Sequence, residues 1–518
     1  MTDRERPVAG PRFVVAVLGA GAVAALTVPD GPPGLGIVLS CLCLAVAVAL
    51  AEPAPRTSPT LGFGVLALLL AAIAVVRDAS WLVALDLLAA LAVGSLAVAG
   101  GRGPAAVARG LAAVLAHAPR APGFLANSTG RAVGSARLGH AVPAVRALAI
   151  GSVLVAVFGA LFASADEAFA RLAPDLTPAW SPEMAVARTA VFALAACLAG
   201  ALALGGPRFA PRPDAAWSGP LPRADLRAVS EADVGQRRLT PFEWALPLLL
   251  LNGLFAVFVA VQATTFSGGA ARVIQTAGLT YAEYAREGFG QLVVAAALTL
   301  GVVAAAPRLS HRPLPRHETL LKALLGGLCL LTLAILASAL HRLGLYEAAF
   351  GFTRARVAGY AFALWLGALF LLILAAGALG RGAALPRAAV ALTAASLVLF
   401  SLANPDGMAA SGNVERYERT GKIDEEYLSG LSADAVPALA TLPPSASRCA
   451  LAGIASGLTR PGPWSSANLA RTRARGALGA AGWEAVGARG EGRGRFRPAG
   501  REAGGSGSRR ASCLDRGI

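Results

Sequence analysis

Residues 319–340 read TLLKALLGGLCLLTLAILASAL, and this stretch decides the class of fold. Over its whole length it carries a single charged residue, Lys322, close to its first end. A helix of about 20 apolar residues is as long as the hydrocarbon core of a bilayer is thick. The stretch therefore predicts a helix that crosses a membrane.

Similar apolar blocks occur along most of the chain, separated by short stretches rich in Arg, Pro and Gly. The other blocks cover residues 13–28, 34–51, 61–76, 81–99, 146–163, 184–204, 242–264, 289–306, 357–379 and 386–403. Only 15% of the 518 residues are charged, whereas soluble domains contain about 25%. The sequence thus predicts an all-α, polytopic membrane protein with about eleven transmembrane helices, with ten or twelve as the alternatives.

The formal net charge of +16 indicates membrane topology rather than nucleic-acid binding. The loops 100–145 and 205–241 are rich in arginine, whereas 164–183 holds four acidic residues and one arginine. Cytoplasmic loops carry the excess of Lys and Arg, so we expect a cytoplasmic N-terminus. Eleven crossings then place the C-terminal segment outside the cytoplasm. Arg far outnumbers Lys, and Ala, Gly and Pro are abundant, a bias typical of a GC-rich bacterial genome. The predicted location is therefore a bacterial cytoplasmic membrane, with the lipid bilayer as partner and no nucleic acid.

Composition divides the chain into four predicted parts. They are an N-terminal membrane region with basic cytoplasmic loops (1–240), a C-terminal membrane region (241–403), a small helical extramembrane segment (404–488) and a disordered basic tail (489–518). Within the first part, residues 104–117 have the apolar spacing of an amphipathic helix at the membrane interface. The remainder of that loop is expected to be flexible.

Three polar residues within predicted spans are candidates for function, because polar groups in a bilayer are costly. Asp86 is either a proton or cation site within the fourth span or a residue at its interface. Asn252 and Gln262 lie ten positions apart in the seventh span. They are either functional groups or partners in interhelical hydrogen bonds.

The stretch GLTYAEYAREGF at 278–289 stands out between two apolar blocks. Thr280 and Glu283 have the spacing of a capping box, and Tyr281 and Tyr284 then share one face of a helix. Two interpretations are open: an aromatic anchor at the membrane surface, or a lid that presents Tyr, Glu and Arg over a pore or pocket.

A second polar cluster follows the ninth span and is predicted to lie on the same side of the membrane. We expect Glu347 to pair with Arg354 or Arg356 in an outer charged network. Beyond the last span, residues 404–475 are predicted to form short helices, with starts near Met408, Asp424 and Ser432. Such a segment either binds a protein partner or packs on its own membrane domain.

The sequence offers no residue set for metal, cofactor or catalytic chemistry. Gly19-x-Gly21-x-x-Ala24 matches the dinucleotide fingerprint, but another apolar block follows it in place of a βαβ unit. Small residues that let two spans approach closely explain these glycines better. We predict no cofactor, metal or catalytic site, and whether the protein is an enzyme stays open.

Three stretches together resemble one protein family: GLTYAEYAREGF (278–289), LYEAAFGFTRAR (345–356) and NPDGMAASGNVERYERTGKIDEEYLSGLSADAVPAL (404–439). The chain resembles uncharacterised bacterial multi-pass membrane proteins catalogued as domain of unknown function 4153/4173, over roughly 240–475. The resemblance implies a cytoplasmic-membrane protein without an established activity. Its signature positions are Tyr281, Glu283, Tyr284, Arg286, Gly288, Phe289, Arg356, Asn404, Pro405 and Asp406.

Three functions fit these observations. The first is transport, channel activity or envelope maintenance, with the polar outer face as the working surface. The second is a membrane-embedded transferase that acts on a lipid-linked substrate, with Glu283 or Glu347 as the acidic group. The third is a sensor or scaffold that binds a protein through 404–475.

Overall fold

The computed structural model describes residues 7–51, 58–101, 103–135, 182–209, 239–267, 281–458, 462–486 and 495–498. The chain forms two compact units. The first unit joins Met1–Ala210 to Glu426–Ile518, and the second is Pro211–Glu425. The first and last parts of the sequence therefore belong to one unit.

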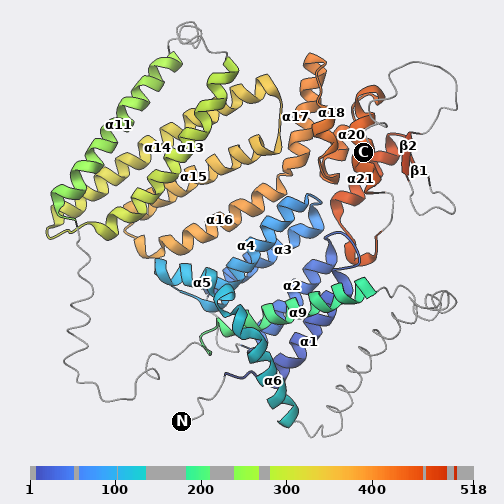
Figure 1. Cartoon of the computed structure of the whole chain (residues 1–518). Helices are drawn as coiled ribbons and strands as arrows, with labels where there is room; N and C mark the ends of the chain where they lie inside the picture. Colours follow the sequence, from blue (N-terminus) through green and yellow to red (C-terminus); the bar gives the residue numbers. More distant parts are fainter. Residues whose placement is uncertain are drawn as a thin grey trace, which may run out of the picture. The chain divides into compact units, whose positions relative to one another are not determined.

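The first unit is built on five apolar helices and a shorter helical pair (Figure 1). The apolar helices are α1 (Pro11–Thr27), α2 (Leu35–Ala51), α3 (Ser58–Val76), α4 (Ser80–Ala99) and α9 (Pro182–Leu204). The sequence neighbours α1 and α2, and likewise α3 and α4, pack side by side, and α9 packs on α1. Gly21 of α1 allows this close approach, because a Cβ there would come within 2.8 Å of the Phe192 ring of α9.

The loop after α4 is helical. Helix α5 (Pro104–His117) has the predicted bounds, and it buries Val107, Gly110 and Val114 on one face. The Ser95 hydroxyl fixes it to α4, donating to the Gly110 carbonyl (2.7 Å) and accepting from the Val114 amide (3.0 Å). The turn η1 (Ala118–Arg120) and helix α6 (Ala121–Ser135) follow where the sequence predicts a flexible stretch.

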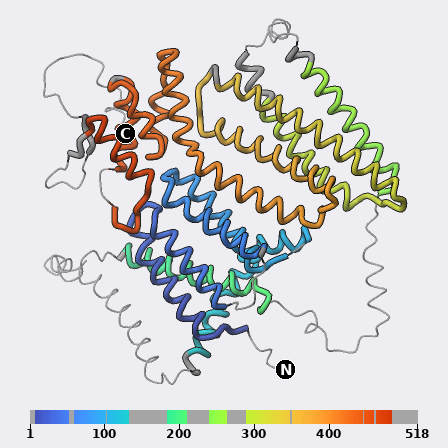
Figure 2. Tube along the Cα trace, turned by 180° about the vertical axis from the view of Figure 1, so that it is seen from behind, coloured from blue at the N-terminus to red at the C-terminus, as the bar shows by residue number. Residues whose placement is uncertain are grey.

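The C-terminal part of the first unit is a chain of short elements. They are α18 (Glu425–Ser429), η4 (Ala433–Ala435), α19 (Val436–Leu439), α20 (Pro444–Ser456), η5 (Trp464–Ser466), α21 (Leu469–Ala480) and the strands β1 (Trp483–Val486) and β2 (Arg495–Pro498). The strands pair antiparallel, with Trp483 opposite Pro498. The element η5 packs on α2 and α21 packs on α3, so the red end of the trace meets the blue helices in Figure 2.

The second unit is arranged around α14 (Pro315–Phe350), which packs against three neighbouring helices. These are α11 (Pro241–Ser267), α13 (Tyr281–Leu309) and α15 (Arg354–Ala378); η3 (Gly382–Ala384), α16 (Leu385–Leu402) and α17 (Pro405–Thr420) complete the unit. Leu328, Leu366 and Phe370 form the centre of its core. With 36 residues, α14 is longer than the ~30 Å hydrocarbon core requires.

Eight of the described helices are long and apolar enough to cross a membrane, and α1 and α2 are shorter apolar helices. Ten of the predicted spans coincide with these helices, and the predicted span 146–163 lies outside the described residues. Large apolar side chains such as Leu250, Leu298 and Leu364 are exposed on them, as expected for surfaces that face lipid. The chain is a multi-pass helical membrane protein.

Candidate functional site

Two of the stretches that carry the family resemblance, 345–356 and the beginning of 404–439, meet at the turn between α14 and α15. Gly351 ends α14 with φ +82°, a conformation that glycine adopts without strain. Its amide donates to the Glu347 carbonyl at 2.8 Å. Thr353 then caps α15, since its hydroxyl accepts from the Arg356 amide at 3.3 Å.

Helix α17 is fastened to this turn by polar contacts. The Asn413 side chain binds both backbone polar groups of Phe352: it accepts from the amide (3.4 Å) and donates to the carbonyl (2.7 Å). Gly412 leaves room for the Phe352 ring, because a Cβ there would lie 2.4 Å from it. Asn404, with φ 63°, begins α17 by accepting from the Gly407 amide at 3.0 Å.

A bidentate ion pair joins the starts of α15 and α17. The Arg354 Nε and Nη2 atoms each lie 2.6 Å from an oxygen of Asp406, and Asp406 is fully buried. A paired fork of this kind is the strongest geometry that arginine offers a carboxylate. Of the two arginines expected as partners of Glu347, Arg354 pairs with Asp406 instead, and Arg356 is the one that lies near Glu347.

Glu347 lies in the last turn of α14, within a helix rather than in the loop that the sequence predicts. It is 9% exposed, and its Oε1 atom has no hydrogen-bond partner among the described residues. The Tyr360 hydroxyl and the Arg356 guanidinium are its polar neighbours. The Arg356 guanidinium also stands 4.3 Å from the centre of the Tyr346 ring. We call Tyr346, Glu347, Arg356 and Tyr360 the Glu347 cluster.

The tyrosine-containing stretch forms the beginning of α13. Tyr281, Glu283, Tyr284, Arg286 and Gly288 lie in its first two turns, and their side chains lie outside the described residues. Phe289 is the first described side chain. A Cβ on Gly359 would lie 3.2 Å from the Phe289 ring, which places Phe289, about two turns into α13, beside the turn of α15 that contains Tyr360.

The three polar residues predicted within spans lie in different units: Asn252 and Gln262 in the second, and Asp86 in the first. Asn252 of α11 donates to the Leu324 carbonyl of α14 (3.1 Å), and Gln262 accepts from the Ser338 hydroxyl (3.4 Å). Both therefore make the interhelical hydrogen bonds that were one of their two interpretations. Asp86 belongs to the first unit, where it is fully buried in α4.

The first unit contains a polar network that the sequence does not predict. Asp434, at η4, accepts from the Asp78 and Ala79 amides (2.7 and 3.2 Å) and from the Arg77 guanidinium (3.2 Å). In return, Asp78 accepts from the Ala433 amide at 3.3 Å. Each carboxylate thus accepts from backbone amides of the other segment: Asp434 from the two residues before α4, and Asp78 from the first residue of η4.

Two residues of α21 and its N-cap extend this network. Asn468 donates to the Ala74 and Arg77 carbonyls at the end of α3 (2.9 and 2.8 Å). Arg471 pairs with Asp78 at 2.5 Å and donates to the Pro33 carbonyl between α1 and α2 at 2.9 Å. We call Arg77, Asp78, Asp434, Asn468 and Arg471 the Asp78–Asp434 network.

The Asp434 carboxyl group of this network is buried, and burial disfavours its ionised form. Burial raises the pKa of the Asp434 carboxyl above its ordinary value, whereas hydrogen bonds from the Asp78 amide and the Arg77 guanidinium, and the positive charge of Arg77, oppose the rise. The ionised form of Asp434 therefore depends on these donors. No chemistry beyond fastening the chain follows from this geometry.

Among the described residues, no group of three or more His, Cys, Asp or Glu side chains is placed to hold a metal ion. No curated protein and no solved structure matches the chain significantly. A family model described as "Domain of unknown function (DUF4153)" matches residues 64–442. This match includes both the Glu347 cluster and the Asp78–Asp434 pair, covers well over half of the chain and confirms the resemblance. The protein therefore belongs to the DUF4153 family of multi-pass membrane proteins.

Proposed function

We propose that the protein is a proton-coupled membrane transporter in which Glu347 takes up and releases the proton. The observation that carries this proposal is the buried carboxyl group of Glu347, whose Oε1 atom has no hydrogen-bond partner among the described residues. A buried carboxylate without enough donors is costly unless it takes up a proton or a cation.

The neighbours of Glu347 favour a proton over a metal cation. Arg356 already supplies a positive charge nearby, and a second cation would be repelled by it. The Tyr360 hydroxyl can donate a hydrogen bond to the carboxylate when the proton leaves. Loss of the proton strengthens the attraction between α14 and α15, and its return weakens it, which couples protonation to the packing of these helices.

The predicted topology puts the Glu347 cluster at the outer face of a bacterial cytoplasmic membrane. Proton-coupled transport uses the proton gradient across such a membrane, with acidic residues of the transmembrane region as relays. Phe289, at the end of the tyrosine-containing stretch, packs against Gly359 of α15, one residue before Tyr360, and this contact supports the lid interpretation of that stretch.

The first test is growth of a deletion strain complemented with variants. Glu347→Gln removes the titrating group while keeping its size, and we expect loss of complementation. Glu347→Asp keeps a carboxyl group and should restore growth in part. Glu415→Gln is the control, because the Glu415 side chain is 69% exposed and should complement fully at equal expression.

A second test reads the proton directly. N,N′-dicyclohexylcarbodiimide modifies protonated carboxyl groups in apolar surroundings, so membranes treated with it should carry one adduct on the peptide that contains Glu347. The labelling should fall as the pH rises and should be absent in Glu347→Gln. Full complementation by Glu347→Gln, together with labelling that does not change with pH, would exclude the proposal.

A further inference from the structure

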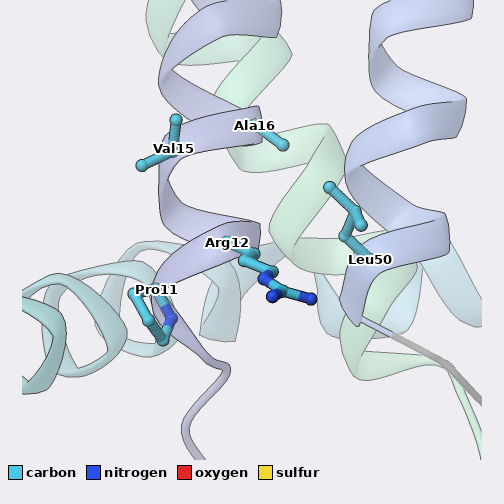
Figure 3. A pocket seen from close by; sticks show the side chains of 5 residues that line it. All are labelled: Pro11, Arg12, Val15, Ala16 and Leu50. Atoms are coloured by element: carbon cyan, nitrogen blue, oxygen red, sulfur yellow. The ribbon is translucent and has the colours of Figure 1, made fainter.

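The first unit has an open groove between α1 and α2, with a volume of about 420 Å³. It is lined by Pro11, Arg12, Val15, Ala16 and Leu50. Figure 3 shows the side chains of Arg12 and Ala16 on α1 directed toward Leu50 on α2. Apart from Arg12, the lining is apolar.

The walls of this groove are suited to a hydrocarbon chain. Val15 is 70% exposed and Leu50 is 44% exposed, and both lie on apolar helices of a membrane protein. Within a bilayer, exposed side chains of this kind contact lipid. A groove of this form therefore holds part of an acyl chain in the membrane.

Arg12 gives the groove a charged end. Among the described residues, it has no ion pair and no hydrogen-bond partner for its guanidinium. It lies in the first turn of α1, which contains no acidic residue. The positive end of the helix dipole is at this turn, so both the side chain and the backbone favour an anion.

The neighbouring helix does not cancel this positive charge. The carboxyl end of α2 carries the negative end of its dipole, but Arg208 already donates to the Ala51 carbonyl at 3.3 Å. The predicted topology puts this end of the unit at the cytoplasmic face, where basic pockets between transmembrane helices bind anionic headgroups.

We propose that the groove between α1 and α2 binds a phospholipid with an anionic headgroup. The headgroup phosphate pairs with Arg12, and one acyl chain lies against Val15, Ala16 and Leu50. This site is in the first unit, and it is independent of the proton site at Glu347.

Native mass spectrometry of the full chain, released from detergent after incubation with phosphatidylglycerol or phosphatidylcholine, tests the proposal. We expect the wild-type chain to retain phosphatidylglycerol in preference. Arg12→Gln should lower that preference about five-fold, the factor that one arginine contributes near an anionic lipid surface. Arg109→Gln is the control, since Arg109 is exposed on α5 and its guanidinium contacts its own helix.

A second pair of variants tests the apolar part. Leu50→Trp fills the groove and should reduce binding of phosphatidylglycerol, while Leu42→Trp, at 43% exposure on the same helix but outside the groove, should not. Equal lipid preference in Arg12→Gln and wild type, or equal loss in the two tryptophan variants, overturns the proposal. Displacement of the lipid by millimolar inorganic phosphate would assign the site to a free anion instead and also overturns it.

Discussion

Asp434 and Arg77 are the most deeply buried ion pair among the described residues, with side chains that are 1% and 10% exposed. Removing charges from water is costly, and a buried pair returns little net stability. The geometry here offsets the cost by giving Asp434 two backbone amides as well as the guanidinium. The effect of this ion pair is to fix η4 against the beginning of α4.

Truncating this carboxylate should therefore be severe. Asp434→Ala leaves Arg77 buried with a lost partner, and we expect a loss of about 3–5 kcal/mol in the free energy of unfolding. The measurement is thermal or denaturant unfolding of the detergent-solubilised protein. Glu415→Ala, which breaks an exposed pair with Arg419 at 3.9 Å, should cost less than about 0.5 kcal/mol.

The double variant Arg77→Met with Asp434→Leu sharpens this prediction. If the penalty of Asp434→Ala comes from an unpaired charge, removing both charges should recover much of the stability. A double variant as unstable as the single one would show that the backbone hydrogen bonds carry the effect instead.

At this scale, the sequence predicts residues better than partners. It marks Glu347, Arg356 and Asp406 as candidates, and the structure brings all three to the α14–α15 turn and the start of α17. It could not reveal the Asp78–Asp434 network, because 357 residues separate Arg77 from Asp434 and no local pattern encodes their contact. The N-cap residue Asn468 is a local signal that does mark the start of α21.

Among the elements, α17 shows how a helix that is not among the candidate membrane spans is fixed to a pair of helices that are. A tight turn, a bidentate ion pair and one asparagine hold it against α15. The turn works because Gly351 combines a positive φ with close contact to Asn413, whose Oδ1 would lie 2.7 Å from a Cβ.

Gly351→Ala should therefore loosen α17. The substitution imposes both backbone strain and a steric clash, and we expect a loss of about 2–3 kcal/mol. Gly380→Ala is a matched control: its φ of +65° is similar, but a Cβ there would meet nothing within 4 Å, so about 1 kcal/mol is expected. Unfolding measurements and limited proteolysis after α16 compare the two. Equal losses would mean that contact with Asn413 is unimportant.

Elements were predictable where the signal is local. Hydropathy marks the apolar part of α14 at 319–340. The helix itself continues past the apolar run to Phe350 and ends at Gly351, whose φ is +82°. The amphipathic period fixes α5 at 104–117. Helix α6 follows although its stretch contains Pro122, Gly123 and Gly130, because packing against α9 stabilises it.

For the whole molecule, contacts within the first unit constrain the membrane topology. Asp78, between α3 and α4, contacts the Ala433 amide, so these two points share one membrane face. The described helices α4, α9, α11, α13, α14, α15 and α16 supply seven crossings between them. If the predicted span 146–163, which lies outside the described residues, is counted as an eighth, the even number agrees with a shared face for Asp78 and Ala433.

Cysteine labelling in whole cells tests this arrangement. With the six native cysteines replaced, Lys422→Cys should react with a membrane-impermeant maleimide in intact cells. Arg109→Cys should react only after the membrane is permeabilised. Labelling of both positions from the outside, or of neither, would contradict the eleven-span topology.

Some contacts within the first unit join residues that are synthesised early to residues that are synthesised late. Asn468 donates to the Ala74 carbonyl across 394 positions. The entire second unit is therefore synthesised before Asn468 emerges from the ribosome. Until then, Arg77 and Asp78 at the end of α3 lack their partners Asp434, Asn468 and Arg471. A chain released before α21 is complete would therefore leave the end of α3 without the hydrogen bonds from Asn468 and Asp78 without its ion pair to Arg471.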